Sequence, residues 1–581
     1  MVFHPPVWTP QLPEIPDSIT VGEFLSNESH GRYNLDLSRS PYTCGLTGKT
    51  YAAREVVDRT ECIARSLATR LRFDPHDGTE WDRVVCLFSL NTIDYIPLTH
   101  AIHRLNGIVT PASAASSAAE LEQQLRSSRA SAIFTSIPLL GTALEAARAV
   151  NIPEEAIFIL SLPLSETREV AVTGLVPLSV DDLVAEGHGL PAVNPLSWTR
   201  GQGARQVAYL CYSSGTSGLP KAVKISHFNI IANILQIAAF EGPTRKQRGV
   251  NTQVNLGVLP LGHIYGLTVI ALASQYRGDE VIILPRFNLG TFLDSVERFK
   301  IERLYLVPPI IIQMMNNEEA CRRRDLTSVR SVYSGAAPLG AELIRSYLKR
   351  YPDVAITQSY GLTEASPMVV ITSEVDGLVG SSGSVIPGTK IKLVDVQGKE
   401  VTSHETRGEL LVQSPSVVLG YFENEKATAE TFVWDNDGRW LKTGDEVLVR
   451  KSSLGHEHLV VVDRIKELIK VKGHQVAPAE LEAHLMAHPF VSDCAVIPVP
   501  HPLADEVPKA FVVKSNEAPL DDKETALAIS QHVREHKARY KWLTGGVAFL
   551  DSIPKSPSGK ILRRTLKDQE KQRLSNIKAK I

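Results

Sequence analysis

Short apolar runs alternate with amphipathic helical patterns along most of the first 360 residues. The runs Val84–Leu90 and Val254–Leu259 are typical of buried strands. Apolar residues recur at helical spacing after Thr50, and Ser117 with Glu120 forms a capping-box sequence at the start of another predicted helix. Such alternation predicts an α/β fold with mainly parallel sheets covered by helices.

The pattern changes near residue 379. From there to about residue 462, short strands alternate with turns, which predicts a small β subdomain. A compact α+β pattern follows to the end of the chain. Since a chain of 581 residues exceeds the size of one hydrophobic core, we predict a large N-terminal domain, residues 1–463, and a small mobile C-terminal domain, residues 464–581.

Composition argues against several classes of protein. Hydrophobic residues make up 43% of the chain, charged residues 22%, and the net charge is −2, so we expect no bulk attraction to nucleic acid. The six cysteines include no C-x-x-C pair, which argues against a disulfide framework and against a zinc site of that kind. We also expect no membrane span, because no apolar run reaches roughly 18 residues.

A polar loop, residues 212–221 (YSSGTSGLPK), separates two predicted strands. Its glycines let backbone N–H groups approach an anion closely, while its hydroxyls and the Lys221 ammonium add donors. The loop is not a Walker loop, because Gly218 is followed by Leu219 instead of lysine. On these residues alone, a phosphate-binding loop and a plain turn are both open interpretations.

Further polar motifs carry groups that suit a nucleotide. The motif QSYGLTE, residues 358–364, offers a hydroxyl and a carboxylate, which are oxygen ligands of the kind that Mg²⁺ takes. Asp445 in the sequence LKTGD could bind ribose hydroxyls or simply cap a turn. The segment 463–475 interleaves cations with apolar residues, and Gly559 presents Lys560 at a predicted loop tip.

In this order, the motifs resemble those of the adenylate-forming superfamily, which includes acyl-CoA synthetases. The sequences LPLGHIYG, PKSPSGKILRR and DRIKELIKVKGHQVAPAELE look most like those of 4-coumarate:CoA ligase and of fungal peroxisomal phenylacetyl-CoA ligases. The resemblance covers nearly the whole chain. It implies a ligase that uses ATP and Mg²⁺ to activate a carboxylic acid as acyl-AMP and then transfers the acyl group to CoA.

The resemblance also implies site residues. Thr363, Glu364, Lys466 and Lys560 would be catalytic: Lys560 would polarise the carboxylate and the α-phosphate, and Lys466 would lie at the hinge. Mg²⁺ would be held by Glu364 and Thr216. The residues expected to contact ATP or AMP are Ser213, Ser214, Gly215, Thr216, Ser217, Gly218, Lys221, Gln358, Ser359, Tyr360, Gly361, Thr363, Asp445, Arg464 and Lys560.

The acyl and CoA sites are expected in other segments. Glycines where the family's acyl pocket is lined, together with apolar surface from Tyr265 and Met368, predict room for an aryl acid or a short to medium chain. Two departures from the family pattern are Ser359, where plant enzymes have glycine, and Arg286, where a lysine often contacts CoA. The expected acyl-site residues are His263, Tyr265, Gly266, Gly335, Ala336, Gly361 and Met368, and those for CoA are Arg286, Lys470, Lys472, Gly473 and Gln475.

Several alternatives stay open at this point. One is a stand-alone enzyme that loads its acyl group onto a carrier protein in secondary metabolism, and another is a non-catalytic nucleotide sensor. His484 and His488 have a metal-ligand spacing, but without an H-E-x-x-H motif we interpret them as helix-surface residues. The last three residues, Ala579–Ile581, resemble a variant of a peroxisomal address, which would make the import receptor a partner. A frayed basic helix end is an equally open interpretation of the same residues.

Overall fold

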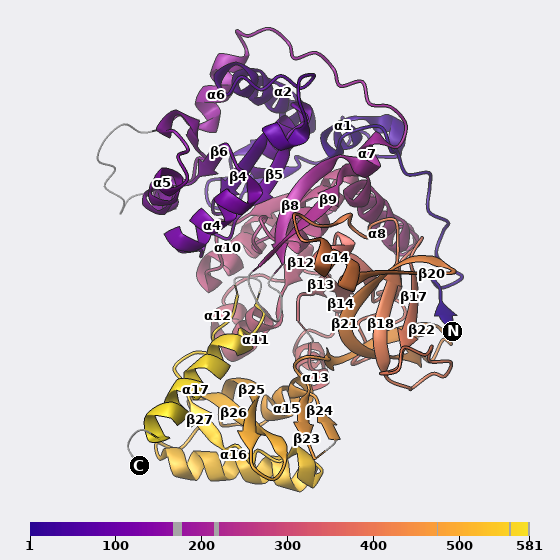
Figure 1. Ribbon diagram of the computed structural model, residues 1–581, viewed down its shortest axis with the longest axis vertical. Coiled ribbons are helices and arrows are strands. Elements are labelled where there is room, and N and C mark those ends of the chain that lie inside the picture. Colours follow the sequence, from indigo (N-terminus) through magenta and orange to yellow (C-terminus); the bar gives the residue numbers. More distant parts are fainter. Residues whose placement is uncertain (167–176, 214–219, 338, 473, 557–558, 579–581) are drawn as a thin grey trace.

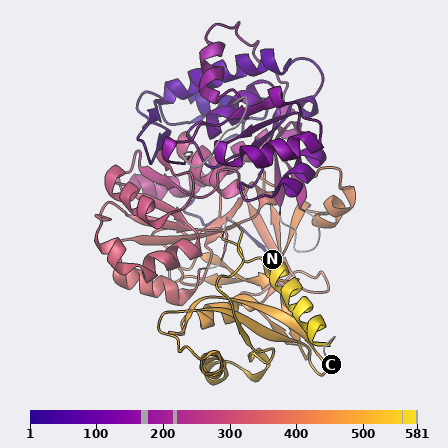
Figure 2. The same cartoon turned by 90° about the vertical axis from the view of Figure 1, so that its left-hand side faces the viewer.

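The computed structural model describes residues 1–581 except 167–176, 214–219, 338, 473, 557–558 and 579–581 (Figure 1). Most of the phosphate loop, Gly473 and the terminal Ala579–Ile581 therefore lie outside the described residues, and their expected roles stay predictions. A large lobe is built from three sheets and their covering helices, and a smaller lobe lies below it (Figures 1 and 2).

The first sheet places its parallel strands at the centre. Strands β14, β13, β12, β10, β11 and β2 run parallel, and the antiparallel strands lie at the edges. The order across this sheet is β16 (Ser384–Val385), β15 (Met368–Ile371), β14 (Ala355–Gly361), β13 (Ser331–Ser334), β12 (Arg303–Leu306), β10 (Val254–Gly257), β11 (Glu280–Ile283), β2 (Tyr42–Cys44) and β3 (Thr50–Tyr51).

The second sheet carries the phosphate loop. Its strands β8, β5, β4, β6 and β7 are parallel, whereas β8 and β9 form an antiparallel pair that the loop connects. The order is β19 (Gly420–Tyr421), β9 (Lys221–Ser226), β8 (Val207–Ser213), β5 (Ile108–Pro111), β4 (Val84–Phe88), β6 (Ala132–Thr135) and β7 (Ile157–Ile159). The prediction of α/β layers with mainly parallel sheets is confirmed.

An antiparallel sheet forms the β subdomain. Its strands are β1 (Val2–Phe3), β17 (Lys390–Val394), β18 (Gly408–Gln413), β21 (Gly438–Lys451), β20 (Phe432–Asp435) and β22 (Glu457–Arg464). The sequence pattern predicted an extended lead-in over the first 50 residues, but two features there are more specific. Strand β1 pairs with β17, and Thr20 caps helix α1 in a capping box with Glu23.

The helices lie against these sheets and in the smaller lobe. Ser117 caps α4 as the capping-box sequence predicted. The helices are α1 (Val21–Ser26), α2 (Ala53–Arg70), α3 (Tyr95–Arg104), α4 (Ala118–Ser128), α5 (Leu140–Ala149), α6 (Val180–Gly187), α7 (Gln202–Arg205), α8 (His227–Gln247), the π-helix η6 (Tyr265–Leu272), α9 (Ala273–Tyr276), α10 (Leu289–Phe299), α11 (Pro308–Asn316), α12 (Glu318–Arg322), α13 (Ala341–Arg350), α14 (Glu425–Thr431), α15 (Pro478–Leu485), α16 (Asp522–His536) and α17 (Arg563–Lys578).

The smaller lobe has its own hydrophobic core. Buried residues from Ile469 to Leu566 form one cluster, separate from the main cluster, which extends from Phe3 to Leu459. These two cores agree with two folding units, although the boundary at residue 463 stays a prediction. The strands of the smaller lobe are β24 (His474–Val476), β23 (Ile469–Val471), β26 (Asp505–Lys514), β25 (Val491–His501) and β27 (Val547–Phe549).

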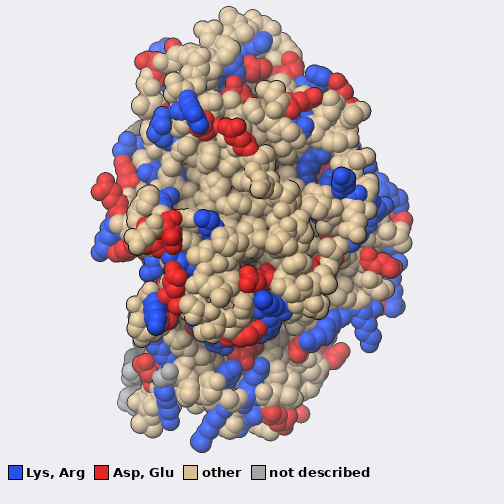
Figure 3. Space-filling view, turned by 90° about the vertical axis from the view of Figure 1, so that its right-hand side faces the viewer, with Lys and Arg blue, Asp and Glu red and all other residues tan. Residues whose placement is uncertain are grey.

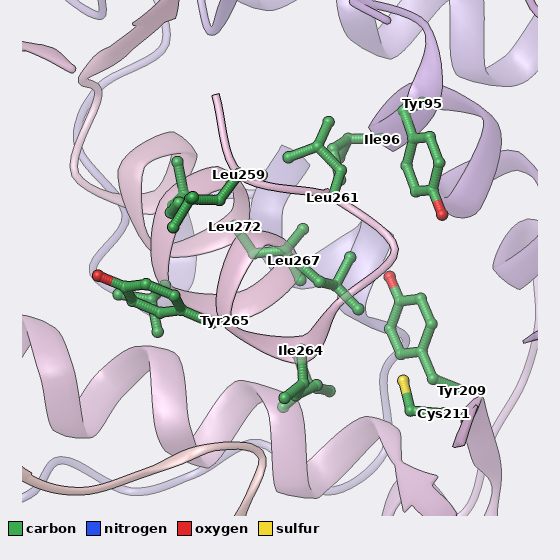
Figure 4. Packing of buried hydrophobic residues seen from close by; sticks show 14 of the residues in the cluster. Tyr95, Ile96, Tyr209, Cys211, Leu259, Leu261, Ile264, Tyr265, Leu267 and Leu272 are labelled. Atoms are coloured by element: carbon green, nitrogen blue, oxygen red, sulfur yellow. The ribbon is translucent and has the colours of Figure 1, made fainter. Parts of the chain in front are cut away.

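The π-helix η6 links the buried core to the site. Figure 4 shows Leu267 and Ile264 between Tyr265 on one side and Tyr209 on the other, and all four residues are at least 95% buried. Tyr265, the first residue of η6, is thus held in place by the packing of its own helix.

On the surface, the face in Figure 3 mixes both signs of charge around a broad uncharged area. Among the described helices, none is long and apolar enough to cross a membrane.

Candidate active site

Asp445 lies at the centre of a buried polar cluster. Strands β21 and β22 pair in a register that places Asp445 opposite Arg464. The Arg464 Nε lies 3.4 Å from Asp445 Oδ1, and the Tyr360 hydroxyl donates to Asp445 Oδ2 at 2.5 Å. Burial raises the pKa of Asp445, while Arg464 and the tyrosine hydroxyl counteract it. The carboxylate has lone pairs left for further donors, which suits the two hydroxyls of a ribose.

Lys560 reaches this cluster from the smaller lobe. Its loop closes through a bond from the Ser556 amide to the Lys560 carbonyl at 2.8 Å. Gly559 has a φ of +83°, and a Cβ there would lie 3.1 Å from Val307 Cγ2, so the loop packs against the end of β12. Burial and the Arg464 charge lower the pKa of Lys560, while Glu467 and Asp445 act in the opposite direction. One ammonium of the small lobe therefore lies at the predicted nucleotide site.

His263 is a further buried side chain within reach of the Lys560 charge. Burial, and to a smaller extent the Lys560 charge, lowers its pKa to about 4. The His263 Nδ1 accepts a hydrogen bond from the Tyr265 amide at 3.2 Å. His263 is therefore neutral at pH 7, and its Nδ1 is held by the chain that enters η6.

Tyr421 connects the predicted metal ligand to the phosphate loop. Its hydroxyl donates to Glu364 Oε1 at 2.9 Å, and the Lys221 ammonium lies 4.7 Å from the centre of its ring. Ser213 pairs with Lys221 across β8 and β9, so the two described ends of the loop lie together. Ser214, Gly215, Thr216, Ser217 and Gly218 lie outside the described residues. A half-buried carboxylate that accepts only one bond among the described residues fits a hard cation such as Mg²⁺.

The remaining residues of the QSYGLTE motif differ in their roles. Gln358 accepts from the Leu339 amide and donates to the Ser381 carbonyl, so its side chain holds the surrounding loops together. Thr363 begins the short helix that carries Glu364. A Cβ at residue 361 would lie 2.3 Å from the Pro367 carbonyl oxygen, so Gly361 permits a close backbone approach instead of leaving open space.

Of the predicted acyl-site residues, Tyr265 and Gly335 lie side by side. A Cβ at residue 335 would lie 3.2 Å from both Tyr265 Cζ and Ser359 Oγ, and the backbone of Ala336 has a positive φ of 67°. The interpretation of Gly266 as open pocket space was wrong, because a Cβ there would lie 2.1 Å from the Pro260 carbonyl oxygen. Met368 is fully packed, and its main chain bonds to Asn233.

The residues predicted for CoA lie away from this cluster. Lys470 and Gln475 are exposed on the β23–β24 hairpin, and Lys472 bonds through its amide to the Ala504 carbonyl. The hairpin lies at the lower part of the small lobe in Figure 1. Arg286 is 69% exposed and pairs with Glu166 at 3.1 Å. Lys466 is exposed in the turn between β22 and β23.

Several residues of the site carry no motif signal. Tyr305 and Tyr333 stand behind Tyr265, whose hydroxyl donates to the Tyr333 carbonyl at 3.1 Å. Arg563 bonds Glu467 at 2.5 Å and Glu482 at 2.6 Å, and so fixes the base of the Lys560 loop. These contacts join segments far apart in the sequence, so the sequence did not predict them. Of the residues involved, only Arg563 had a signal, its charge beside the PKSPSGK motif.

Comparison with known proteins decides the family. A profile described as "AMP-binding enzyme" matches residues 42–422, and one described as "AMP-binding enzyme C-terminal domain" matches residues 480–560. The chain belongs to the AMP-binding enzyme family. Acyl-CoA ligase AFT1-1 of Alternaria alternata is 43% identical to it over 98% of this chain and 97% of the relative. Acyl-CoA ligase easD of Emericella nidulans is 40% identical over 98% and 100%.

Solved structures share the fold of this AMP-binding enzyme. The anthranilate CoA ligase AuaEII in complex with anthranoyl-AMP aligns with a TM-score of 0.77 and 24% identity over 96% of this chain and 98% of that one. ATP-bound MatB from Rhodopseudomonas palustris aligns with a TM-score of 0.75 and 23% identity over 95% and 99%. The expected adenylate-forming fold is confirmed, and the sequence relatives place the chain among the AMP-forming acyl-CoA ligases.

Proposed function

We propose that this enzyme activates an aryl acid or an acid of short to medium chain length with Mg·ATP, and then transfers the acyl group from AMP to the thiol of CoA. The observation that carries the proposal is the position of Lys560, which the small lobe brings to Asp445, Arg464 and His263. A nucleotide and an acid bound at this cluster would lie beside a cation, which would balance the negative charge of the α-phosphate and the carboxylate.

In the first half-reaction, a carboxylate oxygen attacks the α-phosphorus of ATP and the bond to pyrophosphate breaks. Asp445 would hold the ribose, while Lys560 and Arg464 would balance the charge that grows on the phosphate oxygens. Such fixed charges, already in place before the reaction, are usually the largest catalytic contribution. Glu364 would hold Mg²⁺, with Thr216 of the phosphate loop as the second expected ligand; the ion would supply further charge neutralisation.

The acid would lie between Tyr265, Gly335 and Ser359. Tyr305 and Tyr333 close the space behind Tyr265, with ring centres 5.3 Å apart. A wall of tyrosine rings supports a flat ring or a chain of limited length. The neutral His263 would not compete with Lys560 for the carboxylate.

The second half-reaction needs a different arrangement of the lobes. The CoA thiol attacks the acyl carbon and AMP leaves, but the Lys470–Gln475 segment expected to line the CoA path contacts residues of its own lobe. We therefore propose that the small lobe turns about Lys466 between the two steps.

The test is pyrophosphate release with ATP, Mg²⁺ and a set of acids: phenylacetic, phenoxyacetic, cinnamic, benzoic and medium-chain fatty acids, with palmitate as the long-chain comparison. Acyl-CoA would then be measured by chromatography, beside an acceptor reaction with a phosphopantetheine carrier protein. We expect pyrophosphate and CoA thioester from at least one aryl or medium-chain acid. Transfer only to the carrier would replace CoA as acceptor, and a palmitate rate equal to the best aryl acid would contradict the substrate class.

A further inference from the structure

A histidine cluster lies on two packed helices of the small lobe. His484 lies on α15, and His532 and His536 lie one turn apart on α16, so the last two share a helix face. The helices α15 and α16 are in contact and are both labelled in the lower lobe of Figure 1. The rings of His484 and His532 stack with centres 4.2 Å apart, and the ring of His536 lies 4.9 Å from that of His532.

Three ring nitrogens of the cluster lie close together. One ring nitrogen from each of His484, His532 and His536 lies within 4.8 Å of the other two. In a tetrahedral zinc site, ligand nitrogens are about 3.4 Å apart, which follows from zinc–nitrogen distances of 2.0–2.1 Å. The exposed His536 side chain can cover this difference by a small rotation, because solvent borders it.

The hydrogen bonds of the cluster leave the nitrogens available for an ion. The Nε2 of His532 is buried and has no hydrogen-bond partner among the described residues, although buried polar atoms normally have one. His536 Nδ1 donates to the His532 carbonyl at 2.8 Å, which leaves Nε2 as its ligating atom. The bond from His484 Nε2 to that carbonyl is 3.5 Å long and therefore weak.

Neutral imidazole is the form that binds a metal. His488 stands at the edge of the cluster, and its Nδ1 already accepts from the Phe490 amide at 3.2 Å, so we do not count it as a ligand. Imidazole ligands suit Zn²⁺, Cu²⁺ or Ni²⁺, whereas Mg²⁺ and Ca²⁺ take oxygen ligands.

We propose that His484, His532 and His536 bind one transition-metal ion of the zinc class and so tie α15 to α16. Water would occupy the fourth position. The first turn of α15 is held at the hinge, because the Ala479 amide donates to Asp463 Oδ2 at 2.9 Å. The ion would therefore stiffen the helix that lies next to the hinge, and it would take no part in the reaction at Lys560.

The test uses the full-length enzyme, freed of metal with a chelator, and Zn²⁺ alone as the probe. Isothermal titration should give one saturable site per chain. Thermal unfolding with Zn²⁺ should give a higher midpoint than without it. Co²⁺ should give the visible absorption bands of a tetrahedral site. His484→Gln and His536→Gln should each weaken Zn²⁺ binding at least tenfold, with pyrophosphate release unchanged.

A matched control separates this cluster from the other candidate group. Asp58, Cys62 and His188 also lie within ligand distance of one another, so His188→Gln serves as the comparison. If Zn²⁺ binding survives in both His484→Gln and His536→Gln, or is lost in His188→Gln alone, the proposal is wrong. The absence of saturable binding in the wild-type chain would also overturn it. Retained binding in His188→Gln with loss in the other two variants would support it.

Discussion

Two regions of the molecule contain buried ionisable side chains whose pKa is shifted by desolvation. One is the site itself, where Asp445 and Lys560 both have shifted pKa values because they are desolvated. The other is the contact of α3 with β8, where His103 is fully buried with its Nε2 3.1 Å from the Ala208 carbonyl. The first region holds residues that we propose bind the nucleotide, whereas the second holds none of the proposed site residues, so we expect it to affect stability.

His103 should make the enzyme acid-sensitive. Burial lowers its pKa from the usual 6.5 to about 4, so the unfolded chain binds a proton that the folded chain does not bind between these pH values. Stability from this group is fully present above pH 6.5 and is lost as pH falls towards 4, by up to about 3 kcal/mol. His103→Phe should cost stability at pH 7.5, through the lost hydrogen bond, but show a smaller fall in thermal midpoint between pH 7.5 and 4.5.

The control for this prediction is His76→Phe, since His76 is exposed. Its midpoint should follow the wild-type pH dependence. Equal pH slopes for wild type and His103→Phe would contradict the prediction.

Tyr333 should limit the length of the acid. Its carbonyl accepts a hydrogen bond from Tyr265 of the proposed acyl site, and it also lines a cavity of 280 Å³ together with Glu241, Arg303 and Thr357. Tyr333→Val would remove the ring at this cavity, so the ratio of kcat/KM for decanoate to that for phenylacetate should rise about tenfold, the gain expected for one or two methylene contacts. Kinetics with both acids would measure this ratio.

Tyr351→Val is the comparison for Tyr333→Val. Tyr351 is half-buried and lines a different cavity, so its replacement should leave the ratio unchanged. An equal change in both variants would show a general loosening of the fold instead of a longer acyl site.

At this scale, the sequence predicted the chemistry of single residues better than their contacts. The family resemblance indicated Asp445, Arg464 and Lys560, and their roles stay predictions, although the structure brings the three side chains together. The bridge from Glu364 through Tyr421 to Lys221 could not be predicted, since it depends on the pairing of β19 with β9. Gly266 was misinterpreted because a missing side chain can leave space for a ligand or for another backbone, and only coordinates distinguish these.

Among the elements, the loop and helix after β27 depend on one ion-pair cluster. Arg563 begins α17 and lies three residues after Lys560, and its guanidinium joins Glu467 of the hinge turn to Glu482 of α15. All three side chains are at least 87% buried. The position of Lys560 therefore depends on this cluster as well as on the loop itself.

Arg563→Ala should lower both stability and adenylation. Two buried carboxylates would be left without their partner, a loss that typically costs about 3–5 kcal/mol, and the Lys560 loop would lose its attachment. Thermal unfolding and pyrophosphate release would measure the two effects. Arg564→Ala, at a side chain that is 71% exposed, should behave as wild type, and a result in which the two variants match would refute the role of Arg563.

Hydrophobic periodicity predicted the strands of the parallel sheets and the helices that cover them. It did not predict two other elements. The strand Val2–Phe3 is too short for a periodic signal and forms only because β17 offers a free edge. The apolar run Tyr265–Leu272 could be recognised as a buried segment, but its π-helical geometry has no counterpart in the pattern of residues.

For the whole molecule, the separate cores of the large and small lobes and the turn predicted to be the hinge matter most. The structure brings Lys560 to the nucleotide cluster, while Lys470 and Gln475 stay exposed on the lower hairpin. We expect that one nucleotide site cannot hold both Lys560 and an open thiol path at the same time. The lobes must therefore take two arrangements if both segments serve the reaction.

Substitutions on the two sides of the hinge should separate the half-reactions. Lys560→Ala should slow acyl-AMP formation about 100-fold, if the loss resembles that of one oxyanion donor, but should still convert supplied acyl-AMP and CoA to thioester. Lys466→Pro should have the opposite effect. This variant should still form acyl-AMP, but its small lobe should not rotate to the thioester-forming arrangement, because proline fixes φ in the turn that joins the lobes. Single-turnover measurement of each step in each variant tests the division, with Lys472→Ala as a variant expected to affect thioester formation alone. Equal losses in both steps for Lys560→Ala would show that one arrangement of the lobes performs both reactions.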